Sequence, residues 1–600
     1  MNTPLRELAA IVFVAALVFF TNLGGPRLWD RDEPRNAGCA AEMLARGDWV
    51  VPVFNGELRA HKPVLLYWLM ISAYAVLGVT EFAARFWSAA LGVGTVVIVW
   101  MIGRRLVGEA AAGWSAVVLA TTLMFTVAAR AATPDSLLIF CCTLAMLVYV
   151  CGTFRAPAVG LQYAAAVPRI PGGYFPTSLP VAAAMYAVMG LAVLAKGPVG
   201  LVLPTAVIGM FLLIMRLPEP VERSTEAAGS PWRRRVVACL RPLAPGHFLR
   251  TCWSMRPVTA LLASLAVALP WYVWVGMRTE GQWLSGFLLE HNVGRALRPM
   301  EGHSGPVLYY PVAVLIGFFP WSILAVPLVL AVARAVRRRD PASAGLVLAV
   351  CWVGVYVGLF SLARTKLPSY VTPCYPALAL LTGWLLDGWS SGLRPIARVW
   401  SRLALATLMV VGLAMLIALP LAARLFLPGD EWLGAIGLVP LVGGAVCLWL
   451  AETQRTAAAA RAMAATAVVL LVGLFAVVSV RVDRHQQSGV LLGEIAARSP
   501  NPRIAAFGCL EPSWVFYAGR PIREFSHRQA ADMAEFLAAP HSYVITRQRD
   551  LGRLEAELSG DLAVLARVPY FLRSGDLVLV GSAAAAPRLA APASPPPARR

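Results

Sequence analysis

The chain has 600 residues, of which 58% are hydrophobic and only 14% are charged. So few charged residues cannot cover a soluble surface, and apolar runs of about 20 residues, the length that crosses a bilayer, recur up to about residue 481. The composition therefore predicts a polytopic α-helical membrane protein. It excludes a soluble enzyme, a nucleic-acid binder and a disordered chain.

The chain is basic, with 52 Lys and Arg against 32 Asp and Glu and a net charge of +20. Arginines in short loops hold those loops in the cytoplasm, so we interpret most of this charge as a topology signal. Attraction to an anionic lipid or substrate is the alternative.

The apolar runs predict about thirteen membrane spans. The first, Leu8 to Leu23, follows Arg6 and Glu7 without a cleavage pattern, which indicates an uncleaved span with a cytoplasmic N-terminus. The others fall near residues 83–103, 112–129, 136–152, 181–196, 199–215, 257–277, 307–333, 342–362, 371–388, 403–425, 433–452 and 462–481.

Arginine clusters predict which loops are cytoplasmic. They lie at Arg104-Arg105, in the segment 216–256, at residues 334–339 and at residues 394–402. Alternation then places residues 25–82, 130–135, 278–306, 363–370 and everything after 482 on the opposite, outer face. The apolar stretch Pro63 to Gly78 would reverse this order if it crossed, and at ~1.5 Å per residue it is short. We expect it to lie in the outer interface, with Tyr67 and Trp68 as anchors.

Residues 1–481 are thus predicted to form the membrane domain, and residues 482–582 have a different character. Helical stretches at 489–498 and 530–538 alternate with strand-like runs at 504–507, 543–546, 562–567 and 577–580. This pattern predicts a small C-terminal α/β domain on the periplasmic side. The Ala- and Pro-rich residues 583–600 are expected to be disordered.

The outer loops carry charges that the topology rule does not explain. Asp30, Asp32 and Glu33 follow the first span, and they are either solvated loop charges or a general base at the membrane surface. Lys62, Lys196 and Lys366 lie on the outer face against the topological bias, which is typical of a site for a lipid phosphate.

The spacing of the histidines and the search for nucleotide-binding motifs indicate which cofactors to expect. His61, His291 and His303 lie on separate outer-loop segments without metal-ligand spacing, so we expect no cofactor and no metal, although a divalent ion stays an alternative. The chain has no Walker motif and no dinucleotide-binding glycine motif in a suitable context, so nucleotide chemistry is not expected.

Five short motifs in order resemble the membrane glycosyltransferases of the GT-C fold. They are Asp32-Glu33, His61-Lys62-Pro63, Asp135, Lys196-Gly197-Pro198 and Lys366-Leu367-Pro368-Ser369-Tyr370. The chain is most similar to the branch with the aminoarabinose-lipid A transferases and the protein O-mannosyltransferases, over residues 5 to 480. Aminoarabinose transferases tend to have Glu-Lys-Pro where this chain has His61-Lys62-Pro63.

The resemblance implies an inverting transfer of a sugar from a polyprenyl-phosphate donor to a lipid or glycan acceptor. In that reading Asp32 matches the catalytic base, with Glu33 as its companion and Asp135 as the acid of the second outer loop. Lys62 matches a ligand of the donor phosphate, and weaker matches are Lys196, Arg364, Lys366 and Tyr370. Further expected substrate contacts are Arg59, His61, Glu290, His291, Arg295 and His303.

Two alternatives stay open on the sequence. The first is a protein O-mannosyltransferase, with a protein acceptor. The second is a secondary transporter, which would show internal repeats and charges at the bilayer midplane. We expect a monomer in the bacterial inner membrane that contacts membrane lipids and no nucleic acid.

Overall fold

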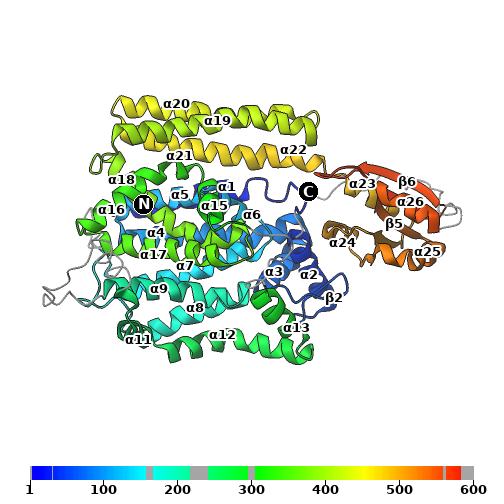
Figure 1. Ribbon diagram of the computed structural model, residues 1–600, viewed down its shortest axis with the longest axis horizontal. Helices are drawn as coiled ribbons and strands as arrows, with labels where there is room; N and C mark the ends of the chain where they lie inside the picture. The colour runs from blue at the N-terminus through cyan, green and yellow to red at the C-terminus, as the bar shows by residue number, and fades with distance from the viewer. Residues whose placement is uncertain are drawn as a thin grey trace, which may run out of the picture.

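The computed structural model describes residues 3–29, 32–156, 166–216, 241–294, 305–557 and 562–582. It has a bundle of long apolar helices and a small α/β domain attached at one end of the bundle (Figure 1). The bundle contains the first part of the chain, and the α/β domain contains the described residues after α22 (Ser479–Arg484). The predicted polytopic helical fold is confirmed.

Every predicted span contains helix. The bundle helices are α1 (Thr3–Phe20), α4 (Glu81–Leu106), α5 (Glu109–Ala120), α6 (Leu123–Arg130), α7 (Pro134–Thr153), α8 (Leu179–Lys196), α9 (Val199–Met215), α11 (Pro245–Ser254), α12 (Pro257–Arg278), α15 (Tyr309–Gly317), α16 (Ala325–Arg337), α17 (Ser343–Leu362), α18 (Tyr375–Ser390), α19 (Arg398–Phe426), α20 (Leu438–Glu452) and α21 (Thr456–Gly473). Among the described residues, 8 helices are long and apolar enough to cross a membrane, or up to 10 if two bent pairs each count as one span. This count is lower than the thirteen expected, because several apolar helices are short or broken.

Two predicted spans are bent. The interval 112–129 is divided into α5 and α6, which meet at 64°. At this break the hydroxyls of Thr121 and Thr122 donate to the carbonyls of Val117 and Val118, a pattern that bends helices. The interval 307–333 is divided into α15 and the helix that starts at Trp321, at 115°. Hydropathy shows only how long an apolar stretch is, so these bends could not be predicted from it.

The predicted outer loops gather at one end of the bundle, which we call the loop end. Here α2 (Asp32–Arg46), the two-residue strands β1 (Val53–Phe54) and β2 (Glu57–Leu58), α3 (Leu65–Leu77), α13 (Gln282–Ser285) and the π-helix Gly286–Gly294 adjoin the C-terminal domain (Figure 1). At the opposite end, the arginine end, α4 finishes against the start of α17, and Arg402 of α19 pairs with Glu452 of α20. The structure thus separates the two sets of loops as the charge pattern predicts.

The short helix α3 covers the apolar stretch that we expected at the interface. It has 13 residues, and Tyr67 in its first turn is fully buried. The Tyr67 hydroxyl accepts a hydrogen bond from Arg59 Nε at 3.1 Å. The anchor role predicted for Tyr67 is therefore wrong, since the side chain is part of the protein interior. Trp68 is partly exposed and donates through its indole to the carbonyl of Trp49.

The C-terminal domain is built on a five-stranded mixed sheet with the order β4-β3-β5-β7-β6. The strands are β3 (Arg503–Phe507), β4 (Arg523–Phe525), β5 (Ser542–Arg547), β6 (Leu562–Pro569) and β7 (Asp576–Ser582), with β4, β3 and β5 parallel. Helices α23 (Ser488–Arg498), α24 (Pro512–Ala518), α25 (Ala530–Ala538) and α26 (Gln548–Glu557) connect and cover them. The four predicted strands and two predicted helices are present; β4, α24 and α26 were not predicted. Residues 583–600 lie outside the described residues.

Candidate functional site

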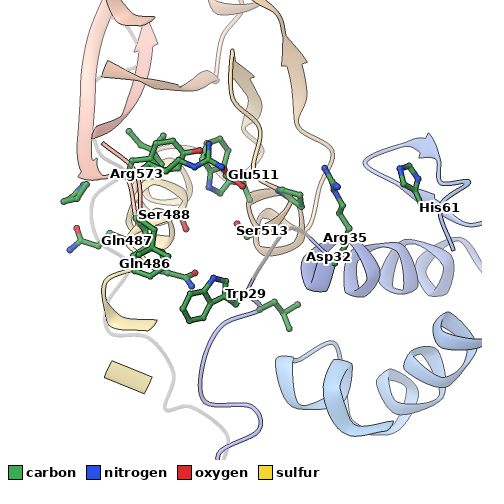
Figure 2. A pocket seen from close by; sticks show the side chains of 18 of the residues that line it. Trp29, Asp32, Arg35, His61, Gln486, Gln487, Ser488, Glu511, Ser513 and Arg573 are labelled. Carbon is green, nitrogen blue, oxygen red and sulfur yellow. The ribbon is translucent and has the colours of Figure 1, made fainter. Parts of the chain in front are cut away.

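A cavity of about 580 Å³ separates the first outer loop from the C-terminal domain (Figure 2). The first outer loop contributes residues between Leu28 and Lys62, and the opposite wall comes from residues 486–488, 511–514 and 569–573 and from Leu577. Four cationic side chains line the cavity, Arg35, Arg59, Lys62 and Arg573, against the two carboxylates of Asp32 and Glu511. A concave site with this excess of positive charge suits an anionic ligand.

Asp32 lies at the rim of this cavity, as the first residue of α2. Its side chain is exposed, and Arg35 follows one helical turn later on the same face (Figure 2). A carboxylate that faces a cavity can take a proton from a bound ligand. Of the three acids predicted to be catalytic, Asp32 alone lines this cavity.

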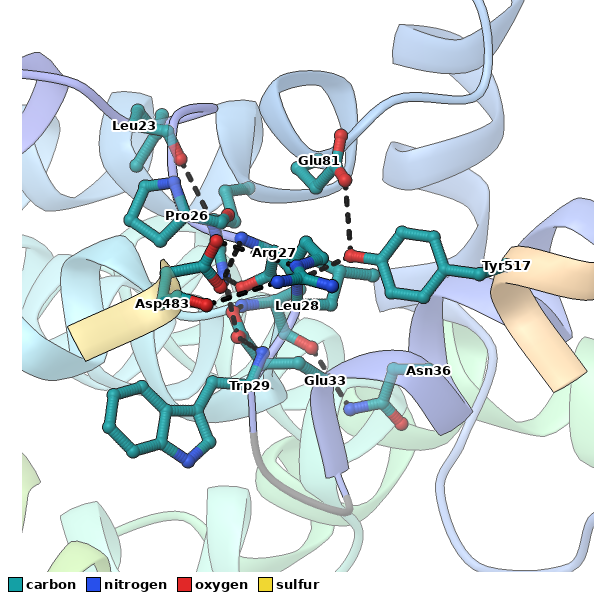
Figure 3. A network of polar contacts seen from close by, with 12 residues as sticks. Leu23, Pro26, Arg27, Leu28, Trp29, Glu33, Asn36, Glu81, Asp483 and Tyr517 are labelled. Atoms are coloured by element: carbon teal, nitrogen blue, oxygen red, sulfur yellow. Dashed lines mark hydrogen bonds and ion pairs between the residues drawn. The ribbon is translucent and has the colours of Figure 1, made fainter. Parts of the chain in front are cut away.

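Glu33 is buried in a network of hydrogen bonds beside Asp32 (Figure 3). Its side chain pairs with Arg85 of α4, and each carboxylate oxygen accepts one guanidinium hydrogen bond at 2.8 Å. The two oxygens also accept the backbone N–H groups of Trp29 and Ala132, both at 2.8 Å. Both Glu33 and Arg85 are only 6% exposed.

This network leaves Glu33 no access to a substrate. The carboxylate joins the first outer loop, helix α4 and the second outer loop, and Arg85 also donates to the carbonyls of Leu23, Pro26 and Arg27. The catalytic role predicted for Glu33 is therefore corrected to a structural one. Glu33 fixes the backbone from which Asp32 and α2 begin.

Asp135 pairs with Lys196 at the loop end. The Lys196 ammonium donates to Asp135 Oδ1, and Thr133 donates to Oδ2 at 3.1 Å. Lys196 is the last residue of α8, where Gly197 takes a positive φ of 88° that ends the helix. The Lys196 ammonium also lies 5.7 Å from the ring centre of Tyr370. The structure thus brings three predicted residues together, but none of them lines the cavity.

Two histidines from distant segments lie side by side at the loop end, with their rings tilted by 33°. The rings of His61 and His291 are 4.0 Å apart. Burial, together with the nearby charges of Arg59, His291, Arg35 and Lys62, lowers the pKa of His61 to about 3. His61 is therefore neutral at physiological pH. Both His61 and Lys62 line the cavity, as the resemblance implied for Lys62.

Arg59 is held in place behind the cavity wall. Its guanidinium donates to Tyr67 and to Asn36 Oδ1 at 3.1 Å, and Asn36 in turn donates to the carbonyl of Ala132. The indole of Trp283 donates to the Arg59 carbonyl at 3.0 Å. Arg59 thus has a fixed position from which its charge acts on the cavity.

Lys366 has a different environment from the one predicted. It is buried, and its ammonium donates to the carbonyls of Phe360 and Ser361 at the end of α17. Burial lowers the pKa of Lys366. Lys366 thus satisfies two of the last carbonyls of a helix, and its predicted contact with the donor phosphate stays a prediction. Arg364 is exposed and does not line the cavity, whereas Leu367 does.

The last three predicted substrate contacts are Glu290, Arg295 and His303. Glu290 is exposed on the π-helix, and Arg295 and His303 lie outside the described residues. Over the described ranges, no group of three or more His, Cys, Asp or Glu side chains could hold a metal ion. Within the part of the chain that the structure describes, His61 and His291 therefore form a pair and belong to no such group.

The C-terminal wall of the cavity was not predicted. It includes Gln486, Gln487, Ser488, Glu511, Ser513 and Arg573 (Figure 2). Arg573 pairs with Glu511 at 3.3 Å, and the Tyr570 hydroxyl donates to the same carboxylate at 2.6 Å. No local pattern in residues 482–582 indicates that these side chains face a loop some 450 residues earlier.

Specific polar contacts hold this wall against the first outer loop (Figure 3). The Tyr517 hydroxyl accepts the N–H of Leu28 at 2.7 Å and donates to Glu81 at 3.0 Å. Arg27 pairs with Asp483 at 3.4 Å. On the hairpin, Asn55 exchanges two hydrogen bonds with the backbone of Ile522, at 2.8 and 2.9 Å.

Comparisons with known proteins bear on the fold and on the kind of protein. Residues 9–168 match the family model of the dolichyl-phosphate-mannose-protein mannosyltransferases. The whole chain is similar to the crystal structure of ArnT from Cupriavidus metallidurans bound to undecaprenyl phosphate, with a TM-score of 0.72, 22% identity and coverage of 97% of this chain and 99% of that one.

These findings define a class. The chain has the GT-C fold, and its predicted resemblance to membrane glycosyltransferases is confirmed. The prediction of an enzyme, a glycosyltransferase, is confirmed as well.

Two curated relatives of this chain are aminoarabinose transferases. The undecaprenyl phosphate-alpha-4-amino-4-deoxy-L-arabinose arabinosyl transferase of Pectobacterium carotovorum is 27% identical over 447 residues, which are 72% of this chain and 69% of the relative. The protein of the same name from Edwardsiella ictaluri is 27% identical over 373 residues, 62% of this chain and 57% of the relative. The chain is thus similar to the aminoarabinose transferases.

Proposed function

We propose that this protein is an inverting glycosyltransferase that moves a sugar from a polyprenyl-phosphate donor to a lipid or glycan acceptor resembling lipid A. The observation that carries the proposal is the cavity at the loop end, where the exposed carboxylate of Asp32 and the ammonium of Lys62 line one wall. The relatives named as undecaprenyl-phosphate sugar transferases support the class of donor.

The side chains of the cavity account for the chemistry of such a transfer. An acceptor oxygen attacks the anomeric carbon, the bond from that carbon to the donor phosphate oxygen breaks, and Asp32 takes the acceptor proton. The departing polyprenyl phosphate carries the electron pair, and the cations Lys62, Arg35 and Arg59 stabilise its charge. Inversion follows from a single displacement with the base on the acceptor side.

The location of the site supports a periplasmic reaction in the inner membrane. The loop end lies opposite the arginine end of the bundle, and arginine-rich loops are cytoplasmic in bacterial membrane proteins. The N-terminus is then cytoplasmic, and the C-terminal domain is periplasmic. We propose that one copy of the chain, with its own C-terminal domain as a wall of the cavity, contains the complete site.

Substitution of Asp32 tests this function. The full chain is purified in detergent and mixed with undecaprenyl-phosphate aminoarabinose and lipid A. Asp32→Asn is expected to lower the rate of transfer by about 10²–10⁴-fold, the usual contribution of a general base, with donor binding retained. Asp532→Asn, the same change on the exposed face of α25, serves as the control. Full activity of Asp32→Asn would remove Asp32 from the mechanism.

A protein O-mannosyltransferase is the second candidate, favoured by the family model over residues 9–168. The two functions differ in both substrates. Transfer of mannose from polyprenyl-phosphate mannose to a serine- and threonine-rich peptide, without transfer to lipid A, would favour this second candidate.

A further inference from the structure

A second cavity adjoins the first at the loop end. It has a volume of about 970 Å³ and lies between the hairpin β1–β2 and the sheet edge formed by β3 and β4. The hairpin side contributes Phe54, Asn55, Glu57, Leu58, Arg59 and His61, and the C-terminal domain contributes residues 502–504, Leu510, Pro512, residues 520–524 and Phe536. It is larger than the cavity assigned above to the donor phosphate and the transferred sugar.

The two cavities share part of their walls. Arg35, Arg59, His61 and Pro512 line both of them. A ligand in the second cavity therefore lies beside the residues that surround Asp32 and Lys62. In a transfer reaction the acceptor is the second reactant, and it must reach the same carboxylate.

The lining of the second cavity is strongly positive. Five arginines, Arg35, Arg59, Arg503, Arg520 and Arg523, face two carboxylates, Glu57 and Glu524, which leaves an excess of three positive charges. Three of these arginines come from the C-terminal domain. Among the described residues, no ion pair includes Arg503, Arg520 or Arg523.

Aromatic rings support two of these guanidinium groups. Arg503 lies 4.8 Å from the ring centre of Phe536, and Arg523 lies 4.6 Å from that of Phe525. Both arginines start from neighbouring parallel strands, since Arg523 is paired with Ala505, two residues after Arg503. A guanidinium on an aromatic face keeps its N–H edges available, and two such groups can hold a phosphate.

We propose that this second cavity binds an anionic phosphate group of the acceptor, with Arg503 and Arg523 as its specificity-determining residues. The inference rests on the proposed function, because it gives the second cavity to the second reactant of that reaction. It also gives the C-terminal domain a role: it selects acceptors that carry a negatively charged group.

Binding to a phosphorylated glycolipid tests the inference without catalysis. The probe is bis-phosphorylated lipid A in neutral detergent, and its Kd is measured on the full chain. The double variant Arg503→Glu with Arg523→Glu is expected to weaken binding by about tenfold to hundredfold, the cost of lost charge-assisted contacts. Removal of both phosphates from the probe is expected to weaken binding to the wild type and to abolish the difference between the two proteins.

A matched variant controls for net charge. Arg528→Glu with Arg553→Glu makes the same charge change at exposed positions of the same domain that line neither cavity. It is expected to bind the probe like the wild type. Equal weakening in both double variants would mean that the general field of the domain, and not the cavity, attracts the lipid, and would overturn the inference.

Further measurements separate the remaining outcomes. Undecaprenyl phosphate binding and the melting temperature check that the variant is folded; if it is not, Arg503→Gln with Arg523→Gln replaces it. Arg503→Lys with Arg523→Lys is expected to restore most of the affinity. If phosphatidylglycerol displaces the probe as well as unlabelled phosphorylated lipid A does, the arginines bind membrane headgroups and the inference is wrong.

The proposed function and the proposed anion site can be refuted separately. Absence of sugar transfer from any polyprenyl-phosphate donor, with phosphate-dependent binding of the probe intact, would overturn the function and leave the anion site. Normal transfer with unchanged probe affinity in the double variant would overturn the anion site and leave the function.

Discussion

The buried pair between Glu33 and Arg85 gives a sharp prediction for Glu33→Gln. In the wild type, Oε1 accepts from Arg85 Nε and Ala132 N, and Oε2 accepts from Arg85 Nη2 and Trp29 N. An amide has one acceptor oxygen and one NH₂ group. Whichever way the Gln side chain is turned, its NH₂ faces two donors, so two hydrogen bonds are lost and the Arg85 charge loses its partner.

The expected cost follows from the burial of both side chains, which are 7% and 8% exposed. Breaking a buried ion pair by removing one charge costs about 3–5 kcal/mol. Arg85 keeps three hydrogen bonds to the carbonyls of Leu23, Pro26 and Arg27, so we expect the low end, about 3 kcal/mol. Because Glu33 also anchors the start of α2, donor binding should weaken along with stability.

Thermal unfolding in detergent measures the effect. Glu33→Gln is expected to melt well below the wild type. Glu109→Gln is the matched control: it breaks the exposed pair with Arg104, and exposed pairs contribute little.

One result would refute this reasoning. If Glu33→Gln melts like the wild type but transfers sugar more than a hundredfold more slowly, Glu33 takes part in the chemistry and the structural assignment is wrong.

Three further changes test other parts of the site. Lys62→Ala should raise the Kd for undecaprenyl phosphate about tenfold, since one charge-assisted contact is lost. The Kd is measured by competition with labelled lipid, and an unchanged value would show that Lys62 does not bind the phosphate. The pKa of His61 is about 3 in the folded state and near 6.5 in the unfolded state, so His61 makes the protein less stable as pH falls below 6.5. His61→Gln should therefore reduce the fall in melting temperature between pH 6.5 and 4. Parallel plots of melting temperature against pH for the two proteins would contradict this. Tyr517→Phe removes the hydrogen bonds to Leu28 and Glu81, so limited proteolysis should release the C-terminal domain faster, and an equal rate would show that these bonds do not hold it.

Local patterns were sufficient for the fold class and for part of the site. Apolar length predicted the helices of the bundle, and short strand-like runs between polar helical stretches predicted β3, β5, β6 and β7 to within a few residues. Charges outside the topology rule pointed to Asp32 and Lys62, which line the first cavity. These signals are readable because each depends on the residue types within a few positions of one another.

Other features depend on contacts between distant segments. The sequence indicated Asp32 as the base and Glu33 as its companion, both as catalytic residues. Only the position of Arg85, 52 residues later, showed that Glu33 is buried while Asp32 is exposed. Lys366 resembled a phosphate ligand in the sequence, but in the fold its ammonium donates to two backbone carbonyls at the end of α17.

The sequence by itself determined that this protein is a helical membrane protein with many apolar helices and that a small α/β domain follows them. The tertiary structure decided which charges face a cavity and which are paired in the interior. It also decided that the C-terminal domain closes both cavities, through contacts such as Tyr517 with Leu28 and Asn55 with Ile522. The physical reason is that hydropathy and periodicity are local properties of the chain, whereas burial and pairing of a charge are set by residues that folding brings from hundreds of positions away.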